Sequence, residues 1–212
     1  MFYETAQNRH GLPHDPFKAI VSPRPIGWIS TRSKDGATNL SPYSFFNAIA
    51  DDPKLVMFCS SGMKDSASFA IESGEFVVNL ATHSLRDAMN RSSAPAPRGV
   101  SEFAIAGLTE APCRLVAAPR VAESPAALEC RVTQSFRPMG LDGPSPSAVM
   151  VIGQVVGIHI DESVLRDGLF AVDLAEPLTR LGYLDYAVTR EVFAMPRPKR
   201  PDAGDITPSP VP

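Results

Sequence analysis

The order of the expected elements constrains the fold of this chain more than any single motif does. Segments with strand character come first, two short helices lie among them, and long strands fill the second half. No strand–helix–strand alternation is visible, which disfavours a parallel α/β sheet. The 212 residues fit one large domain, and all-β barrels often reach this size undivided. We therefore predict a mostly β, antiparallel barrel with short flanking helices.

The strands of the first half are predicted from apolar runs and turn signals. Residues 17–33 form a long extended run with a Pro-Arg-Pro break, which is typical of an edge strand or a barrel corner. An Asp-Gly turn signal at 35–36 joins this run to a strand at 39–50. Residues 54–60 are almost wholly apolar, which predicts a strand buried on both faces, and residues 75–81 form the next strand.

Two short helices and two long strand regions complete the prediction. Helices are expected at 64–73 and 84–90, where small apolar residues recur at helical spacing. Residues 113–136 hold two strand candidates interrupted by prolines. Residues 148–161 are a strong β run whose glycines allow the strand to coil.

The two ends of the chain differ from its middle. The last segment, 193–212, is rich in proline and has the composition of an extended arm or tail. We therefore place the domain at residues 1–192, with a polar N-terminal arm at 1–15. That arm does not have the basic and then apolar order of a signal peptide.

Composition limits the class of protein. The net charge is −3 and no basic aromatic face is visible, so nucleic acid is not an expected partner. No apolar run approaches the roughly 20 residues of a membrane span, so no membrane is expected either. Three cysteines, Cys59, Cys113 and Cys130, are odd in number and widely spaced, which argues against a disulfide framework or a zinc cluster. A reducing, cytoplasmic location follows from that usage.

Self-contained catalytic signatures are not found in the sequence. It has no nucleotide-binding glycine motif, no zinc-protease motif and no serine-hydrolase elbow. The four histidines are scattered without metal-ligand spacing. His159 lies in an apolar strand, where a hydrogen-bonded structural role is favoured, whereas His10 and His14 flank a turn and remain candidates for a nearby site.

One polar segment has the chemistry of an anion site. The run CSSGMKDSASFA passes from a buried strand through Ser60 and Ser61 to Lys64 and Ser66 at a helix N-terminus. Hydroxyls, a lysine and free helical N–H groups together suit a phosphate. The alternative is that Asp65 or Ser66 only caps the helix.

A second segment alternates poorly for a strand. In LSPYSFFNAI, residues 40–49, each face would mix aromatic and polar side chains. Aromatic walls and the Asn47 amide, together with backbone N–H groups, could hold a flat ring with polar edges. The alternative is an aromatic core layer. Taken together, the two segments fit a phosphorylated, ring-bearing cofactor such as FMN, although composition does not distinguish FMN from a nucleotide.

Five segments in order carry a family resemblance. They are PFKAIVSPRPIGWIST, DGATNLSPYSFFNAIADDPKLVMFCSS, KDSASFAIESGEFVVNLAT, PRVAESPAALEC with VIGQVVGIHI, and PLTRLGYLDYA. Over roughly residues 10 to 190, the chain resembles the flavin reductase-like FMN-binding split-barrel family. The resemblance implies a six-stranded antiparallel split β-barrel, noncovalent FMN, a homodimer with flavin near its interface, and reduction of flavin by NAD(P)H.

The resemblance also implies a set of cofactor-binding residues. Main-chain groups of residues 44–47 would line the flavin ring, residues 59–61 would follow the ribityl chain, and a lysine and a serine would hold the phosphate. The expected residues are Ser44, Phe45, Phe46, Asn47, Cys59, Ser60, Ser61, Lys64, Ser66, Arg24, Asn79 and Arg180. No side chain need act as an acid or a base, so no catalytic residue is named.

Family membership leaves the reaction partners open. The chain is longer than the smallest members, which act as reductase partners of two-component monooxygenases, so a monooxygenase partner is possible but not implied. An electron carrier or an oxidase that NAD(P)H does not reduce is the first alternative. A barrel that binds a ligand without redox chemistry is the second.

Overall fold

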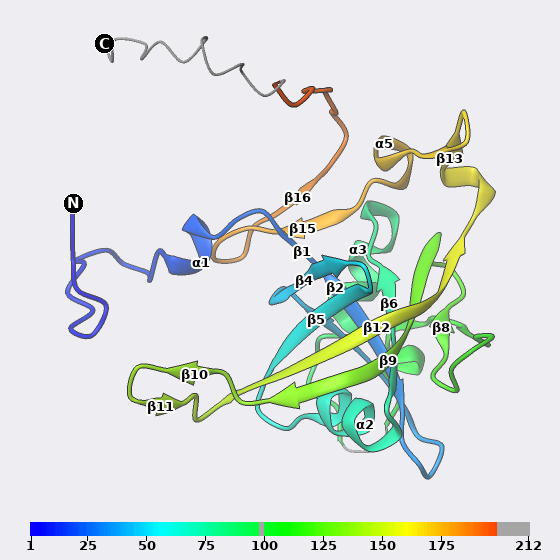
Figure 1. The fold of residues 1–212 in the computed structure, drawn as a ribbon, viewed down its shortest axis with the longest axis horizontal. Coiled ribbons are helices and arrows are strands. Elements are labelled where there is room, and N and C mark those ends of the chain that lie inside the picture. The colour runs from blue at the N-terminus through cyan, green and yellow to red at the C-terminus, as the bar shows by residue number, and fades with distance from the viewer. Residues whose placement is uncertain (98–99, 199–212) are drawn as a thin grey trace.

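A computed structural model describes residues 1–97 and 100–198 of the chain. Seven strands form one curled sheet (Figure 1), and every neighbouring pair in it is antiparallel. In sheet order they are β3 (Thr38–Tyr43), β2 (Gly27–Arg32), β6 (Glu75–Leu80), β9 (Ala126–Phe136), β12 (Ala148–Ile160), β5 (Lys54–Ser61) and β4 (Phe46–Asp51). The predicted mostly β split barrel is confirmed, with seven strands in the main sheet where six were expected.

The segment predicted as one strand at 39–50 is in fact two strands. β3 and β4 lie at opposite edges of the sheet, and the chain turns between them at Ser44 and Phe45. The expected hairpin is confirmed, because β2 pairs with β3 from Gly27 opposite Tyr43 to Arg32 opposite Thr38. Pro42 lies on β3 and is tolerated there because an edge strand needs no second set of ladder bonds.

The run at 17–33 was expected to be extended throughout, and this is wrong for its first part. Residues Phe17–Ile20 form a helical turn, α1, that follows Pro16. The Pro-Arg-Pro break then forms β1 (Arg24–Pro25), and only Gly27–Arg32 joins the main sheet. β1 pairs with β15 (Leu178–Arg180), which pairs with β16 (Tyr186–Val188), so a small second sheet lies beside the barrel.

Short helices cover the barrel ends. The longest is α2 (Asp65–Ser73), which ends at Gly74 with a positive φ of 77°. A 3-10 turn (His83–Leu85) leads into α3 (Arg86–Arg91) near the expected second helix, and α4 (Glu102–Ala106) follows. The remaining elements are β7 (Glu110–Ala111), β8 (Arg120–Val121), β10 (Met139–Gly140), β11 (Gly143–Pro144), a 3-10 turn (Glu162–Val164), β13 (Leu165–Arg166), β14 (Leu169–Phe170) and α5 (Val172–Ala175).

The core lies inside the curled sheet. Phe58, Phe76 and Ile29 are fully buried there, and α2 adds Ala67 and Ala70 to the same cluster. Each large apolar side chain buried in this way stabilises the fold by about 1.5–3 kcal/mol. β5 was expected to be buried on both faces, but its residues alternate between buried and partly exposed. One face of β5 is therefore available to line a site.

The ends of the chain lie outside the barrel. Residues 1–15 run away from the sheet (blue in Figure 1) and carry no helix or strand. Of the predicted tail at 193–212, residues 193–198 are exposed and irregular, and residues 199–212 lie outside the described part of the chain. Within residues 1–97 and 100–198, no helix is long and apolar enough to cross a membrane. All three cysteines are free thiols.

Candidate functional site

The turn between β3 and β4 presents unpaired backbone donors. Within the described chain, the N–H groups of Ser44 and Phe45 make no hydrogen bond. Phe46, which follows the turn, packs its ring against Gly27. A Cβ on Gly27 would lie only 2.5 Å from that ring. Phe45 itself is 41% exposed, and Asn47 is exposed too. Two free N–H groups beside an exposed aromatic ring can receive the polar edge of a planar ligand.

The end of β5 lies next to this turn. The N–H of Cys59 donates to the carbonyl oxygen of Phe45 at 2.8 Å, and Phe58 is the register partner of Phe46. The pairing of β4 with β5 therefore places the predicted ring-binding turn next to the predicted ribityl-binding residues. Desolvation raises the pKa of Cys59, so its thiol stays protonated and inert at neutral pH.

Ser60 carries a buried hydroxyl that makes no hydrogen bond of acceptable geometry with the described residues, although the Tyr43 hydroxyl lies close to it. It is 1% exposed, and its Oγ has no hydrogen-bond partner within residues 1–97 and 100–198. The Tyr43 hydroxyl lies near it: burial raises the pKa of Tyr43, and the hydroxyls of Ser66 and Ser60 offset part of that rise. Ser61, the next residue, is exposed. An unpaired buried hydroxyl costs free energy unless a ligand or water pairs with it.

The N-terminus of α2 follows directly and has no side-chain cap. Lys64 occupies the N-cap position and its side chain makes no capping hydrogen bond, and the alternative of a cap by Asp65 or Ser66 is not observed. The Ser66 hydroxyl instead donates inward to Asn39 Oδ1 at 2.5 Å. Lys64 is exposed and makes no ion pair with any described residue. Free helical N–H groups and an unpaired ammonium suit an anion.

These groups fit the cofactor expected from the sequence. Three kinds of group follow one another along the chain. Free N–H donors lie at the turn before β4, the Ser60 hydroxyl lies near the end of β5, and the uncapped start of α2 follows with Lys64. Their order along the chain matches a flat ring, a polyol chain and a phosphate. For Ser66, the backbone N–H is the group available to that phosphate, because its hydroxyl is used inside the protein.

Asn79 is used within the protein. Its amide group donates to Trp28 O at 3.0 Å and to Ser30 Oγ at 2.9 Å, and its Oδ1 accepts from the N–H of Val121 at 2.8 Å. Asn79 is fully buried, and both of its N–H donors are occupied. The amide bridges three chain segments, so its predicted contact with the cofactor gains no support from this geometry.

Arg24 and Arg180 lie together in a separate cavity. They are register partners in β1 and β15, and both line a cavity of about 530 Å³. Ser44 also lines this cavity, so the cavity adjoins the candidate ring site. His14 also lines this cavity, while the described contacts of His10 are within the N-terminal arm, with Tyr3 and Leu12.

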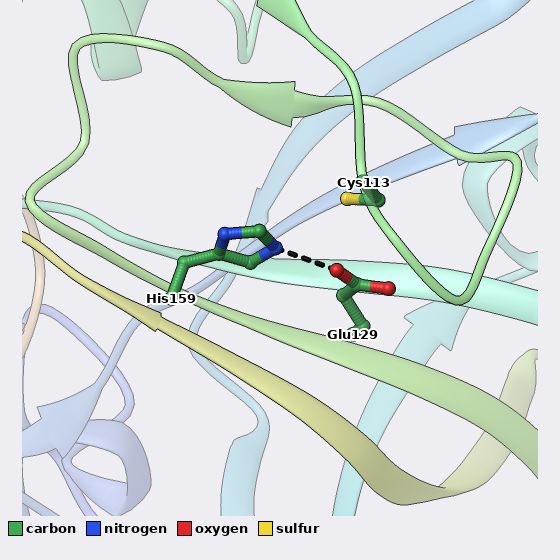
Figure 2. Close-up of side chains that lie close together, drawn as sticks. All are labelled: Cys113, Glu129 and His159. Atoms are coloured by element: carbon green, nitrogen blue, oxygen red, sulfur yellow. Dashed lines mark hydrogen bonds and ion pairs between the residues drawn. The ribbon is translucent and has the colours of Figure 1, made fainter.

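A buried carboxylate that sequence reasoning missed lies on β9, the central strand of the main sheet. The carboxylate of Glu129 accepts from the N–H groups of Arg114 (2.8 Å), Leu115 (2.6 Å) and Val116 (3.2 Å) and contacts His159 Nε2 at 2.5 Å (Figure 2). Desolvation raises the pKa of Glu129, but these partners outweigh it and the net pKa is lowered. The expected hydrogen-bonded structural role of His159 is confirmed.

Cys113 completes this cluster, with its sulfur and the other two ligand atoms all within 4.8 Å of one another. Both oxygens of Glu129 already hold two partners, so the cluster anchors the loop at 114–116 to β9. Burial and the Glu129 charge raise the pKa of Cys113 to about 12. A charged residue inside the apolar run Leu128-Glu129-Cys130 was the signal that could have revealed the anchor.

Several known proteins are similar to this chain in sequence or in fold. An uncharacterised protein of Halalkalibacterium halodurans is 37% identical over 84% of this chain and 87% of its own length. Nitrilotriacetate monooxygenase component B from Bacillus cereus is 29% identical, with a TM-score of 0.81 over 92% of this chain and 98% of its own. The 2-nitrobenzoate 2-nitroreductase of Pseudomonas fluorescens is 26% identical, with a TM-score of 0.82 over 96% of this chain and 100% of its own.

The match to a family model covers the main sheet and two of the three strands of the second sheet. The model for the flavin reductase like domain matches residues 21–181, which include β1, the whole main sheet and β15. The turn at Ser44, the end of β5 and the start of α2 all fall inside that range. This chain therefore belongs to the flavin reductase-like family of flavin-related oxidoreductases.

Proposed function

We propose that the protein is an FMN-dependent oxidoreductase that transfers a hydride from NAD(P)H to bound FMN and then reduces an acceptor. The observation that supports it best is the continuous row of unsatisfied groups from the Ser44–Phe45 turn through Ser60 to Lys64. Family membership supports a flavin, and the phosphate-type site at α2 favours FMN over unphosphorylated riboflavin.

Each part of the row has one role in this proposal. The N–H groups of Ser44 and Phe45 bind the polar edge of the ring and favour negative charge there. Ser60 and Ser61 bind the polyol chain, and Lys64 with the first N–H groups of α2 binds the phosphate. When bound, the flavin would supply two-electron redox chemistry. The chain's own contribution is positioning and electrostatics.

Two similar proteins suggest two kinds of electron acceptor. One has the name of a monooxygenase component and another that of a nitroreductase. Either a monooxygenase partner or a small acceptor would take electrons from the same exposed face beside Phe45. The proposal includes both acceptors, because the exposed turn is accessible to a partner protein and to a small molecule.

We also propose that the protein is a homodimer that forms through the β4 edge. Among the described strands β4 pairs only with β5, and its residues are almost all exposed, including Ile49 at 46%. An apolar cavity of about 400 Å³ lies beside it and is lined by Phe46, Ile158 and Ile160 among others. An exposed apolar edge strand is a ready pairing surface. Sedimentation equilibrium would show a dimer, and Ile49→Lys should shift it towards monomer while Ile105→Lys, on α4, should not.

The central experiment is an absorbance spectrum followed by anaerobic titration. The purified protein should be yellow, and NADH or NADPH should bleach the flavin band. If the flavin is present but neither donor bleaches it, the protein is an electron carrier or an oxidase. If the protein is colourless and FMN neither binds nor stabilises it, the redox proposal fails.

A further inference from the structure

A second site adjoins the proposed flavin site. The cavity of about 530 Å³ has walls from four parts of the chain: residues 14–18, β1 with Arg24, the Ser44 turn, and the hairpin from Arg180 to Tyr186. Its volume is in the range of small-molecule sites, which run from about 300 to 1,000 Å³. Ser44 belongs both to this cavity and to the proposed ring site, but the cations around the cavity have no role in the function proposed above.

Arg24 is a buried cation in this wall. It is 6% exposed, and its Nη atoms donate to the carbonyl oxygens of Lys18, Val21 and Leu181. Its Nε has no acceptor, and no carboxylate of the described chain forms an ion pair with Arg24. A buried guanidinium without a counter-charge is costly, so an anion in the adjoining cavity would stabilise it.

Two more cations face the same cavity. Arg180 lies with its Cζ 4.3 Å from the centre of the Tyr186 ring and donates to Tyr183 O, so its fork is fixed in place. Lys18 is exposed and makes no ion pair within residues 1–97 and 100–198. The cavity has one carboxylate, that of Asp15, which accepts from the N–H of Phe17 at 2.8 Å. Three cations against one anion leave a net positive site.

The walls are packed rather than loose. Gly182, in the hairpin, lies against Ala19 of α1 so closely that a Cβ there would be 2.4 Å from Ala19 Cβ. The rings of His14 and Tyr183 lie 5.5 Å apart. Contacts between the N-terminal arm and the C-terminal hairpin therefore build a site that exists before any ligand enters, which lowers the cost of binding.

We infer that this cavity binds the oxyanion group of the protein's second substrate, a carboxylate or a phosphate, and positions that substrate beside the ring site at Ser44. That the ligand is a second substrate rests on the proposed function, whereas the oxyanion site itself rests on Arg24, Arg180 and Lys18. Arg180 provides the planar fork that matches a carboxylate or phosphate in two hydrogen bonds.

The test is calorimetric titration of the flavin-loaded protein with benzoate and with benzamide, its neutral isostere. We expect benzoate to bind about tenfold or more tightly than benzamide, because charge-assisted hydrogen bonds carry that difference. Arg180→Gln and Lys18→Gln should each remove most of that preference. Arg166→Gln and Lys54→Gln, which alter cations outside the cavity, should leave it unchanged. Arg24 is not altered, because its three carbonyl contacts hold the strand.

The outcomes separate cleanly. Equal affinity for benzoate and benzamide, or cavity variants that behave as the wild type, would overturn the inference. Inorganic phosphate that displaces benzoate shows that the site binds phosphate as well as carboxylate groups, and phosphate that does not displace it restricts the site to carboxylates. If Arg180→Gln lowers the preference for FMN over riboflavin, the cavity holds the flavin phosphate and the inference fails. A protein that binds benzoate but no flavin would refute the redox function and leave the oxyanion site standing.

Discussion

Two buried charges in this barrel are treated in opposite ways. Glu129 is 1% exposed and has four donors, three from backbone N–H groups and one from His159. Arg24 is 6% exposed, has three carbonyl acceptors, lacks any partner at Nε, and lines a cavity. Both residues are charged and buried, yet only the carboxylate has its hydrogen-bonding capacity filled by the protein.

The difference separates structural polar groups from groups that await a ligand. A buried charge with all its partners rigidifies the fold, and removing it leaves those partners unpaired. A buried polar group with vacant capacity beside a cavity costs stability until something binds. By this criterion, Glu129 and Asn79 have structural roles, whereas Arg24 and Ser60 have capacity left for a ligand. Lys64 is exposed, but it too makes no ion pair with any described residue. The predictions below test that division.

The largest effect is expected at the filled charge. Glu129→Ala should lower the free energy of unfolding by about 3 kcal/mol or more, because three backbone N–H groups and His159 lose their partner. Glu123→Ala is the matched control: that carboxylate is exposed and accepts from the N–H of Thr109, so about 1 kcal/mol is expected. Urea unfolding measures both. A loss at Glu129 no larger than at Glu123 would remove the anchor role.

The same anchor should make stability depend on pH. The folded pKa of Glu129 is lowered from its ordinary 4.5, so its stabilisation is fully present above about pH 4.5 and is lost as the pH falls through the folded value. The difference in thermal midpoint between the wild type and Glu129→Gln should therefore be largest at neutral pH and shrink in acid. A difference that stays constant would mean that Glu129 contributes shape and not charge.

A smaller effect is expected at the vacant cation. Lys64→Ala should weaken FMN binding by about 1–3 kcal/mol and riboflavin binding much less, because only FMN offers a phosphate. Lys54→Ala alters a lysine that is paired with Asp51 and should change neither affinity. Fluorescence titration of both flavins gives the ratio. Equal weakening of FMN and riboflavin would place Lys64 away from the phosphate.

The smallest stability effect is expected at the vacant hydroxyl. Ser92 accepts from Trp28 Nε1 at 2.9 Å and donates to Met89 O, so Ser92→Ala should cost about 1 kcal/mol. Ser60→Ala removes a buried hydroxyl that makes no hydrogen bond with the described residues, so it should leave the free energy of unfolding unchanged or raise it by up to about 1 kcal/mol, while weakening flavin binding. Thermal unfolding without flavin, compared for the two variants, decides whether Ser60 is really unpaired.

Local sequence signals predicted some elements closely and others only in part. The Asp-Gly hairpin, the ends of α2 and the long strand at 148–160 were all predicted from nearby residues. The break at Ser44 and Phe45 was not, because it depends on β3 and β4 finding partners at opposite edges of the sheet. No residue near the break indicates that the two strands pair at opposite edges of the sheet.

The candidate site was predicted in part for the same reason. The order of the ring, ribityl and phosphate segments is linear in the sequence, so a resemblance could supply it. The Glu129 anchor and the oxyanion cavity each join segments that are far apart in the sequence. Arg24 meets Leu181 only because β1 pairs with β15. Such contacts are properties of the fold, not of the local pattern.

The turn at Ser44 and Phe45 connects the two edge strands of the curled sheet, so it is the seam of the barrel. A ligand held by that turn and by β5 would therefore fasten the seam as well as occupy a site. Occupancy and resistance to opening then become one thermodynamic quantity, rising with ligand concentration. Backbone amides along β3 and β4, at the two ends of the sheet order, should gain protection from hydrogen exchange together when the cofactor binds.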